Sequence, residues 1–324
     1  MMQPTVEAST SSSMQLTEGW AKELQTLYCN AIKYADAAVS FKHPEDVHQA
    51  RVHIRKLMSL LKVTGDSVVR DSLLSSLRKA HKLLGRIRDR DVLIASFKQR
   101  RRAAVHKERR KLLKAFIRHQ KDERKQARSR AKAKLPKLTK KRIAKQWAAF
   151  VKHELGGSPQ HEQMNNYLLQ LERQFDEHRI HYEQSKQGRG MTDAETLEAL
   201  HKVRLQVKEL RYFLKHVDLA DSVDIQRKRQ YYEQLQESLG RINDRRVWIA
   251  RWNDIGPRKL EADPAAYRAM VRELEEELTQ EIGRLQIERP AIDSHTACYQ
   301  IRGETDEQKA IGYRSERQNR KMSD

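Results

Sequence analysis

The stretch HQARVHIRKLMSLLK at residues 48–62 recurs as HKVRLQVKELRYFLK at residues 201–215. A second pair of segments follows in the same order, LLGRIRDRDVLIA at residues 83–95 and SLGRINDRRVWIA at residues 238–250. The copies are 153 residues apart in the first pair and 155 in the second. This spacing matches no short solenoid period, and it indicates a duplicated helical unit whose two halves are related by a pseudo-two-fold axis.

Both copies of the first motif carry a row of cations when they are placed on a helix at about 100° per residue. The row lies beside a separate aliphatic face, which is typical of an amphipathic helix with one buried side. The cationic row consists of His48, Arg51, Arg55 and Lys62 in the first copy and His201, Arg204, Lys208, Arg211 and Lys215 in the second. Met58 alone interrupts the row, and no acid does, whereas an ordinary exposed helix alternates Glu with Lys.

This arrangement of cations suits a linear polyanion. Successive helical turns rise by about 5.4 Å and repeat a cation along the axis, while Arg supplies forked donors and Lys a mobile charge. Two such helices facing each other would form a cationic trough that needs no metal ion. The alternative is a merely solvated helix face, and the recurrence of the pattern in two copies argues against it.

The charge of the chain also points to a polyanionic partner. The formal net charge is +21, with a pI of about 9.9. Residues 98–145 hold 22 Lys and Arg against 3 Asp and Glu, so the rest of the chain is nearly balanced. This segment could widen a polyphosphate surface, contact nucleic acid without sequence preference, or be a solvated helix with Leu112, Leu113, Phe116 and Ile117 on a packed edge. Its scarcity of aromatic residues argues against base stacking.

Composition predicts an all-α protein, because 38% hydrophobic and 34% charged residues accompany only 12 Gly and 7 Pro. Glycine and proline positions predict helix ends, among them Gly85, Gly240 and the boundary at 156–159. The expected helices cover residues 16–40, 45–63, 67–84, 89–134, 139–154, 161–187, 193–217, 223–239, 244–253 and 264–287. Residues 1–15 are expected to be a disordered tail and residues 288–324 a polar one, flanking halves at about 16–155 and 161–287.

The cysteines and the hydropathy pattern predict a cytoplasmic protein. Cys29 and Cys298 have no metal-ligand spacing and fit free thiols in a reducing compartment. The sequence predicts neither a signal peptide nor a membrane span, since it has no run of about 20 apolar residues.

Both repeats together resemble the CHAD family, a histidine-bearing α-helical domain. The resemblance lies in His48-x-x-Arg51-x-x-x-Arg55 and His201-x-x-Arg204-x-x-x-Lys208, each followed by Leu-Gly-Arg-Ile and Asp-x-x-Val, and it covers residues 16–287. It implies two four-helix bundles around a central basic pore that binds inorganic polyphosphate, lined by the cationic rows. Further candidates for polyphosphate contact are Lys79, Lys82, Arg86 and Arg241. Met58 departs from the family pattern and weakens one position of the pore.

The resemblance and the missing motifs favour binding without catalysis, and the resemblance also suggests recruitment to polyphosphate granules. The Glu-x-Glu-x-Lys signature of the triphosphate-tunnel domain that accompanies many family members is absent, as are a nucleophile motif and a Gly-rich phosphate loop. Asp89, Asp91 and Asp244 are the only carboxylates considered for a metal. Asp89 and Asp244 are expected instead to cap helices or orient an arginine. No cofactor and no metal site are expected, and an enzyme of polyphosphate turnover is the less favoured alternative.

Overall fold

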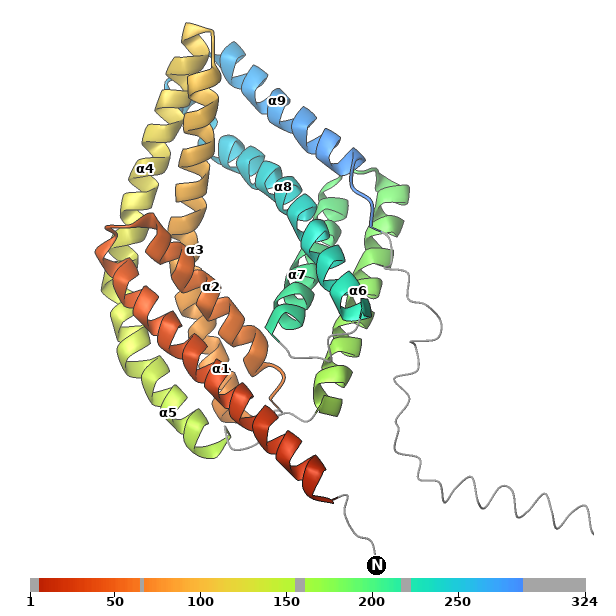
Figure 1. The fold of residues 1–324 in the computed structure, drawn as a ribbon. Coiled ribbons are helices and arrows are strands. Elements are labelled where there is room, and N and C mark those ends of the chain that lie inside the picture. Colours follow the sequence, from red (N-terminus) through yellow and green to blue (C-terminus); the bar gives the residue numbers. More distant parts are fainter. Residues whose placement is uncertain (1–5, 65–66, 155–160, 217–222, 288–324) are drawn as a thin grey trace, which may run out of the picture. The chain divides into compact units, whose positions relative to one another are not determined.

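The computed structural model describes residues 6–64, 67–154, 161–216 and 223–287, and every regular element in these ranges is helical (Figure 1). The all-α prediction is therefore confirmed. The elements are α1 (Val6–Ser40), α2 (Pro44–Leu61), α3 (Val68–Ala103), α4 (Lys107–Pro136), the π-helix η1 (Lys137–Ile143), α5 (Ala144–His153), α6 (His161–Arg189), α7 (Ala194–His216), α8 (Val223–Leu260) and α9 (Pro264–Gly283). None of the described helices is long and apolar enough to cross a membrane.

Several helices begin where local sequence provides a cap. Pro44 occupies the first turn of α2, where a missing amide hydrogen costs nothing. The Ser67 hydroxyl accepts hydrogen bonds from the amides of Val69 and Arg70 at 3.1 and 3.3 Å, and this caps α3. The Asp263 carboxylate accepts from the amide of Ala266 at 2.8 Å and caps α9.

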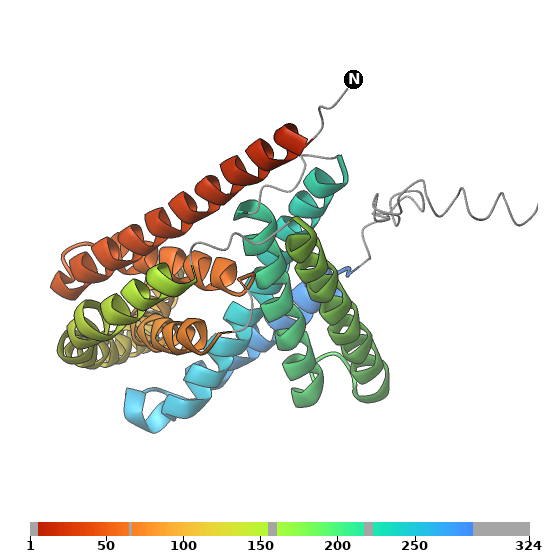
Figure 2. The ribbon, with the colours of Figure 1, turned by 90° about the horizontal axis from the view of Figure 1, so that it is seen from below.

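Most helices pack against their neighbours in the chain. The contacts run from α1 to α2, α2 to α3 and α3 to α4, and then from α6 to α7, α7 to α8 and α8 to α9. In Figure 2, α4 and α5 lie on one side of the view, and α6 lies on the other. Close backbone contacts between the N-terminal and C-terminal helices join α2 to α7 and α4 to α8 and α9. Side chains of α3 also reach α8 and α9.

The core has two parts. The larger cluster of buried apolar residues involves α1 to α8 and the last turns of α9. The smaller cluster lies at the C-terminal part of α3 and the N-terminal part of α4. There Phe116 stacks on Trp252 of α8 with ring centroids 4.1 Å apart. The Tyr267 hydroxyl of α9 donates a hydrogen bond to the Trp252 carbonyl at 2.7 Å. These contacts tie α9 and the end of α8 to the α3/α4 pair.

Two predicted helix ends are wrong, because α3 and α8 run without interruption through Gly85 and Gly240. Asp89 and Asp244 consequently lie inside helices, where the amides around them already bond to carbonyls one turn back, so neither residue is a helix cap. The helix predicted over 89–134 is also wrong in extent. It is divided by a turn at residues 104–106, where the Arg110 guanidinium donates to the carbonyls of Ala104 and Val105, both at 2.9 Å.

Other boundaries are corrected by smaller amounts. Helix α1 begins at Val6, so residues 6–15 are helical where a disordered tail was expected. The chain passes through Pro136 into the π-helix η1 instead of breaking. Cys29 is free and exposed, whereas Cys298 and the polar tail at 288–324 lie outside the described residues.

A cationic pocket between the two repeated motifs

A pocket of about 620 Å³ lies between α2, α3, α7 and α8, and both copies of the repeated motif contribute to its lining. The predicted site residues that line it are Arg51, Arg55, Lys62, His201, Arg204 and Lys208. Seven Arg and Lys side chains line the pocket against three carboxylates, which are Asp89, Glu209 and Asp244. The pocket is therefore a cationic site with fewer acids than it needs for neutrality.

Gly85 makes room for Arg51. The Arg51 guanidinium donates from Nη1 to the carbonyl of His81 at 3.2 Å, across the α3 backbone. A Cβ atom on residue 85 would collide with that same nitrogen, so the glycine of the Leu-Gly-Arg-Ile motif provides space for an arginine from α2. Burial lowers the pKa of Arg51, and the Asp89 carboxylate opposes that shift.

Arg55 bridges the two halves of the pocket. Its Nη1 donates to the Tyr212 hydroxyl at 3.2 Å, and its guanidinium lies 5.4 Å from the Tyr212 ring centroid. Its Nη2 lies 3.2 Å from Nε2 of His81, which must accept because a guanidinium only donates. Burial, together with the charges of Arg51, Arg55 and Lys208, lowers the pKa of His81 to about 3, so its imidazole is neutral.

Lys208 is the most strongly perturbed cation in the pocket. Burial is the main cause that lowers its pKa to about 7, and the charges of Arg204, Arg55 and Arg51 add to it. Cations from both motifs thus lie within electrostatic reach of one another. Arg204 is half-buried, and its buried Nε is without a hydrogen-bond partner in the described structure. The Asp244 carboxylate opposes the lowering of the pKa of Arg204 by burial, as Asp89 does for Arg51.

The far end of the cationic row is paired across the two halves. Lys62 forms an ion pair with Glu209, whose carboxylate also accepts from the Tyr167 hydroxyl at 2.8 Å. The corresponding pair in the repeat, Lys215 and Lys56, is like-charged, and its repulsion adds to burial in lowering the pKa of Lys56. The duplication is therefore symmetric in sequence position but not in charge.

Arg78 and His81 of α3 also line the pocket, and sequence reasoning missed both. Their counterparts in the second copy, at an offset of 155, are Glu233 and Gln236, so the duplication gives no signal for them. Arg211, the counterpart of Met58, donates to Glu233 at 2.6 Å and to Gln236 at 3.3 Å. In the second copy Arg211 is thus neutralised by Glu233. The corresponding residues of the first copy are Met58 and Arg78, a methionine and a cation, and both line the pocket.

The remaining predicted residues are not part of the pocket lining. His48 lies near Arg51 and Arg88, whose charges add to burial in lowering its pKa. Arg241 donates to Glu281 at 3.0 Å. The others are exposed: Lys79, Lys82, Arg86 and Lys215.

Histidine charge contributes less to the site than the sequence suggested. Burial lowers the pKa values of both His48 and His201, the latter with help from Arg246 and Arg204. Neutral imidazole is therefore the dominant form at neutral pH, and Lys208 becomes the group that titrates there.

The carboxylates considered for a metal have other partners. Asp91 accepts from Arg124 of α4 at 2.8 Å and lies outside the pocket. Within the described ranges no three His, Cys, Asp or Glu side chains gather closely enough to hold a metal ion.

Comparisons with known proteins place this geometry in context. The model of the CHAD domain family matches residues 24–253. A crystal structure of the CHAD domain from the plant Ricinus communis superposes with a TM-score of 0.58 at 20% identity, covering 84% of this chain and 92% of that chain. PptA from Streptomyces chartreusis superposes with a TM-score of 0.59 at 11% identity, covering 82% of this chain and 95% of that chain. At these identities the two structures support the fold alone. No curated protein sequence matches the chain.

Proposed function

The chain belongs to the CHAD family, and from that premise we propose that it binds inorganic polyphosphate in the cationic pocket without catalysing a reaction. The observation that carries the proposal is the convergence of Arg51, Arg55, Arg204 and Lys208, from both motifs, on one pocket. The charge of Arg55 adds to burial in lowering the pKa values of Arg51, Arg204 and Lys208, and a bound polyanion would relieve this repulsion. A single chain of phosphates carries negative charge that would neutralise the excess cations of this pocket.

We also propose that the two halves form pseudo-symmetric four-helix bundles and that the pocket is part of a basic pore between them. Helices α2 and α7, which carry the equivalent motifs, contact each other, as a two-fold axis between the halves requires. The Arg55 contact with Tyr212 and the Lys62 pair with Glu209 both cross this junction.

Two features of the carboxylates support binding without turnover. The Asp89 charge favours the protonated forms of Arg51 and Arg204, and the Asp244 charge favours those of Arg204 and Lys208, so both carboxylates support the pocket cations. Asp91 has no acidic counterpart, because Arg246 replaces it in the second copy. Binding of this kind would bring the protein to polyphosphate granules.

The test is titration of short-chain polyphosphate into a variant that combines Arg204→Gln with Lys208→Gln. The matched control combines Arg211→Gln with Lys215→Gln, which removes one arginine and one lysine from the same helix at residues outside the pocket lining. We expect the pocket variant to lose at least about tenfold in affinity, because a charge-assisted hydrogen bond contributes roughly 1.5–3 kcal/mol. The control should bind as the wild type does.

Equal losses in the two variants would contradict the pocket assignment, because they would report net charge alone. A competition with RNA and duplex DNA at two salt concentrations tests the ligand class. If nucleic acid displaced short polyphosphate from the wild type at moderate salt, the polyphosphate proposal would be wrong.

A further inference from the structure

The outward face of α4 carries a row of seven exposed cations, which we call the α4 stripe. At about 100° per residue its members fall within roughly 40° of one line. The stripe consists of Lys107, Lys111, Lys114, Arg118, Lys121, Lys125 and Lys132, all exposed. Lys107 and Lys132 are 25 positions apart, and thus about 37 Å apart along the helix axis at 1.5 Å per residue.

The stripe is separate from the pocket. The opposite face of α4 is its packed face, where Leu113 and Phe116 are fully buried against the smaller core. No residue of α4 lines the pocket. A ligand on the stripe therefore meets none of the groups assigned to polyphosphate.

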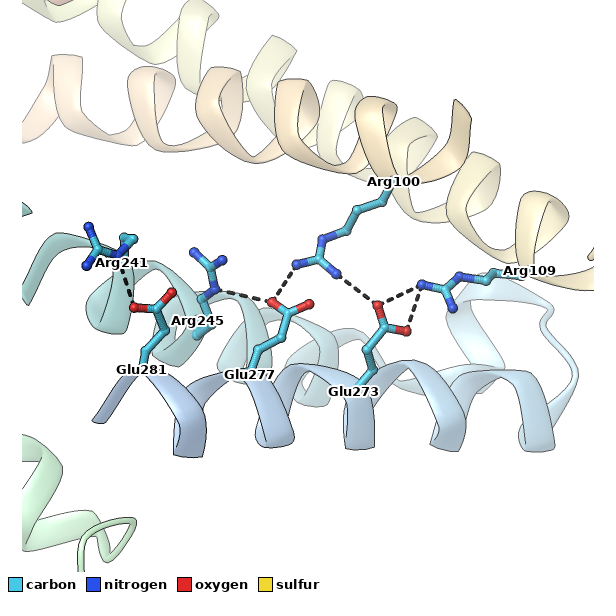
Figure 3. Close-up of polar contacts among 7 residues, drawn as sticks. All are labelled: Arg100, Arg109, Arg241, Arg245, Glu273, Glu277 and Glu281. Carbon is cyan, nitrogen blue, oxygen red and sulfur yellow. Dashed lines mark hydrogen bonds and ion pairs between the residues drawn. The ribbon is translucent and has the colours of Figure 1, made fainter. Parts of the chain in front are cut away.

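The fold neutralises the inward arginines of this region but not the stripe. Glu273 and Glu277 of α9 form ion pairs with Arg100 and Arg109, at distances between 2.6 and 3.0 Å (Figure 3). By contrast, none of the seven stripe cations has an ion-pair partner in the described parts of the chain. Lys111, Lys114, Arg118 and Lys121 share a pocket with the carboxylates of Glu108, Glu261 and Asp263. Because no ion pair among the described residues joins these groups, the four cations remain available to an external anion.

The shape of the stripe favours a stiff ligand. A flexible chain of phosphates loses conformational freedom when it is held straight over this length. A nucleic-acid duplex is already straight, since its persistence length is about 50 nm, and it offers one phosphate charge per about 1.7 Å. Phe116 of α4 is buried, and α4 exposes no aromatic side chain. The stripe therefore has no ring on which the bases of a single strand could stack.

We infer that the α4 stripe is a second anion-binding surface, which binds the phosphate backbone of double-stranded nucleic acid without sequence preference. The inference is independent of the polyphosphate proposal, because the two sites share no residue. Binding at such an open surface is strongly salt-dependent, since each neutralised phosphate releases a counterion.

The test measures the binding of labelled DNA and RNA duplexes of about 20 base pairs to the full chain across a salt series. The stripe variant combines Lys111→Gln, Lys114→Gln, Arg118→Gln and Lys121→Gln. The control combines Lys22→Gln, Lys42→Gln, Lys259→Gln and Arg268→Gln, four exposed cations outside α4 with the same charge in total. We expect the slope of log affinity against log salt to fall by up to about 3.6 in the stripe variant, roughly 0.9 per lost contact, and to stay unchanged in the control.

Three results would overturn the inference. An equal loss in the control would mean that net charge alone attracts the duplex. A greater loss of long polyphosphate than of duplex in the stripe variant would assign the stripe to polyphosphate. Loss of duplex binding in the Arg204→Gln, Lys208→Gln variant would place nucleic acid in the pocket. Separate measurements with DNA and RNA show which duplex is preferred. Short-polyphosphate binding by the stripe variant shows independently whether the cationic pocket still binds its ligand.

Discussion

At the scale of single residues, the pocket depends on a glycine as much as on its cations. Gly85 lies inside a continuous helix, where glycine costs about 1 kcal/mol relative to alanine. A Cβ atom at residue 85 would meet Arg51, whereas a Cβ atom at its counterpart Gly240 would point into open space. The two glycines occupy equivalent positions, but only one of them accommodates a binding residue.

We predict that Gly85→Ala and Gly240→Ala will have different effects. Both gain helix propensity of up to about 1 kcal/mol, but only Gly85→Ala should displace the Arg51 guanidinium and weaken short-polyphosphate binding. Denaturant unfolding and binding titrations on the two variants check this. If Gly85→Ala binds as tightly as Gly240→Ala, the position of Arg51 is not set by the space at residue 85.

A second prediction concerns Lys208 and pH. Its pKa in the free protein is about 7, below its ordinary value of 10.5, so it loses its proton as the pH rises above 7. Polyanion binding favours the ammonium form, so affinity should fall with rising pH, and binding near pH 8 should take up protons. Calorimetry in two buffers with different ionisation enthalpies measures that uptake. Lys208→Met should take up fewer protons than the wild type, and an identical uptake would contradict the assignment.

The sequence revealed the cations on α2 and α7 because their motif repeats. It could not reveal His81 or Arg78, whose roles depend on tertiary contact and whose counterparts are different residues. Nor could it show that Arg211 is neutralised by Glu233, since that pairing joins two helices.

At the scale of elements, the largest errors of prediction concern where helices end. Gly85 and Gly240 are residues of the type that ends helices, yet helix packing holds both in helical conformation. The turn at residues 104–106 contains neither glycine nor proline. That turn forms because Phe97 and Phe116 pack together, 4.7 Å between ring centroids, once the chain has reversed. Packing partners distant in sequence therefore decide these boundaries.

Helix α9 is held by a row of glutamates, and one of them offers a prediction about stability. Glu277 bonds Arg100 at 2.6 Å and Arg245 at 3.2 Å, linking α9 to α3 and α8 (Figure 3). We expect Glu277→Gln to destabilise the protein by about 1–2 kcal/mol at neutral pH, as measured by denaturant unfolding. Glu276→Gln, at an exposed neighbouring position, is the control.

The same residue predicts a pH dependence. Burial raises the pKa of Glu277, but the hydrogen bonds and charges of Arg100 and Arg245 outweigh burial and lower it overall. A depressed carboxyl pKa stabilises the fold at neutral pH, and that contribution is lost as pH falls through the folded-state pKa. The stability difference between Glu277→Gln and the wild type should therefore shrink in acid. A stability difference that stays constant with pH would mean that the ion pairs of Glu277 do not contribute to the stability of the fold.

At the scale of the whole molecule, duplication produces one mixed site in place of two equal ones. Fold class and the repeat were readable from the sequence, because periodicity and composition are local properties. The difference in charge between the two copies could not be read from the sequence, because it arises where the halves meet. There Lys62 pairs with Glu209, whereas the corresponding residues Lys215 and Lys56 repel each other. We propose that cations of both copies bind one polyphosphate chain together.

Calorimetric titration of the wild type, Arg55→Gln and Lys208→Gln with short polyphosphate measures how many chains each protein binds, and so whether the two copies share one site. Because Arg55 and Lys208 come from different copies but line the same pocket, we predict one chain bound per protein in all three. Each single variant should weaken that one site. Two chains per wild-type protein, with one lost in each variant and the other bound at full affinity, would contradict the shared site.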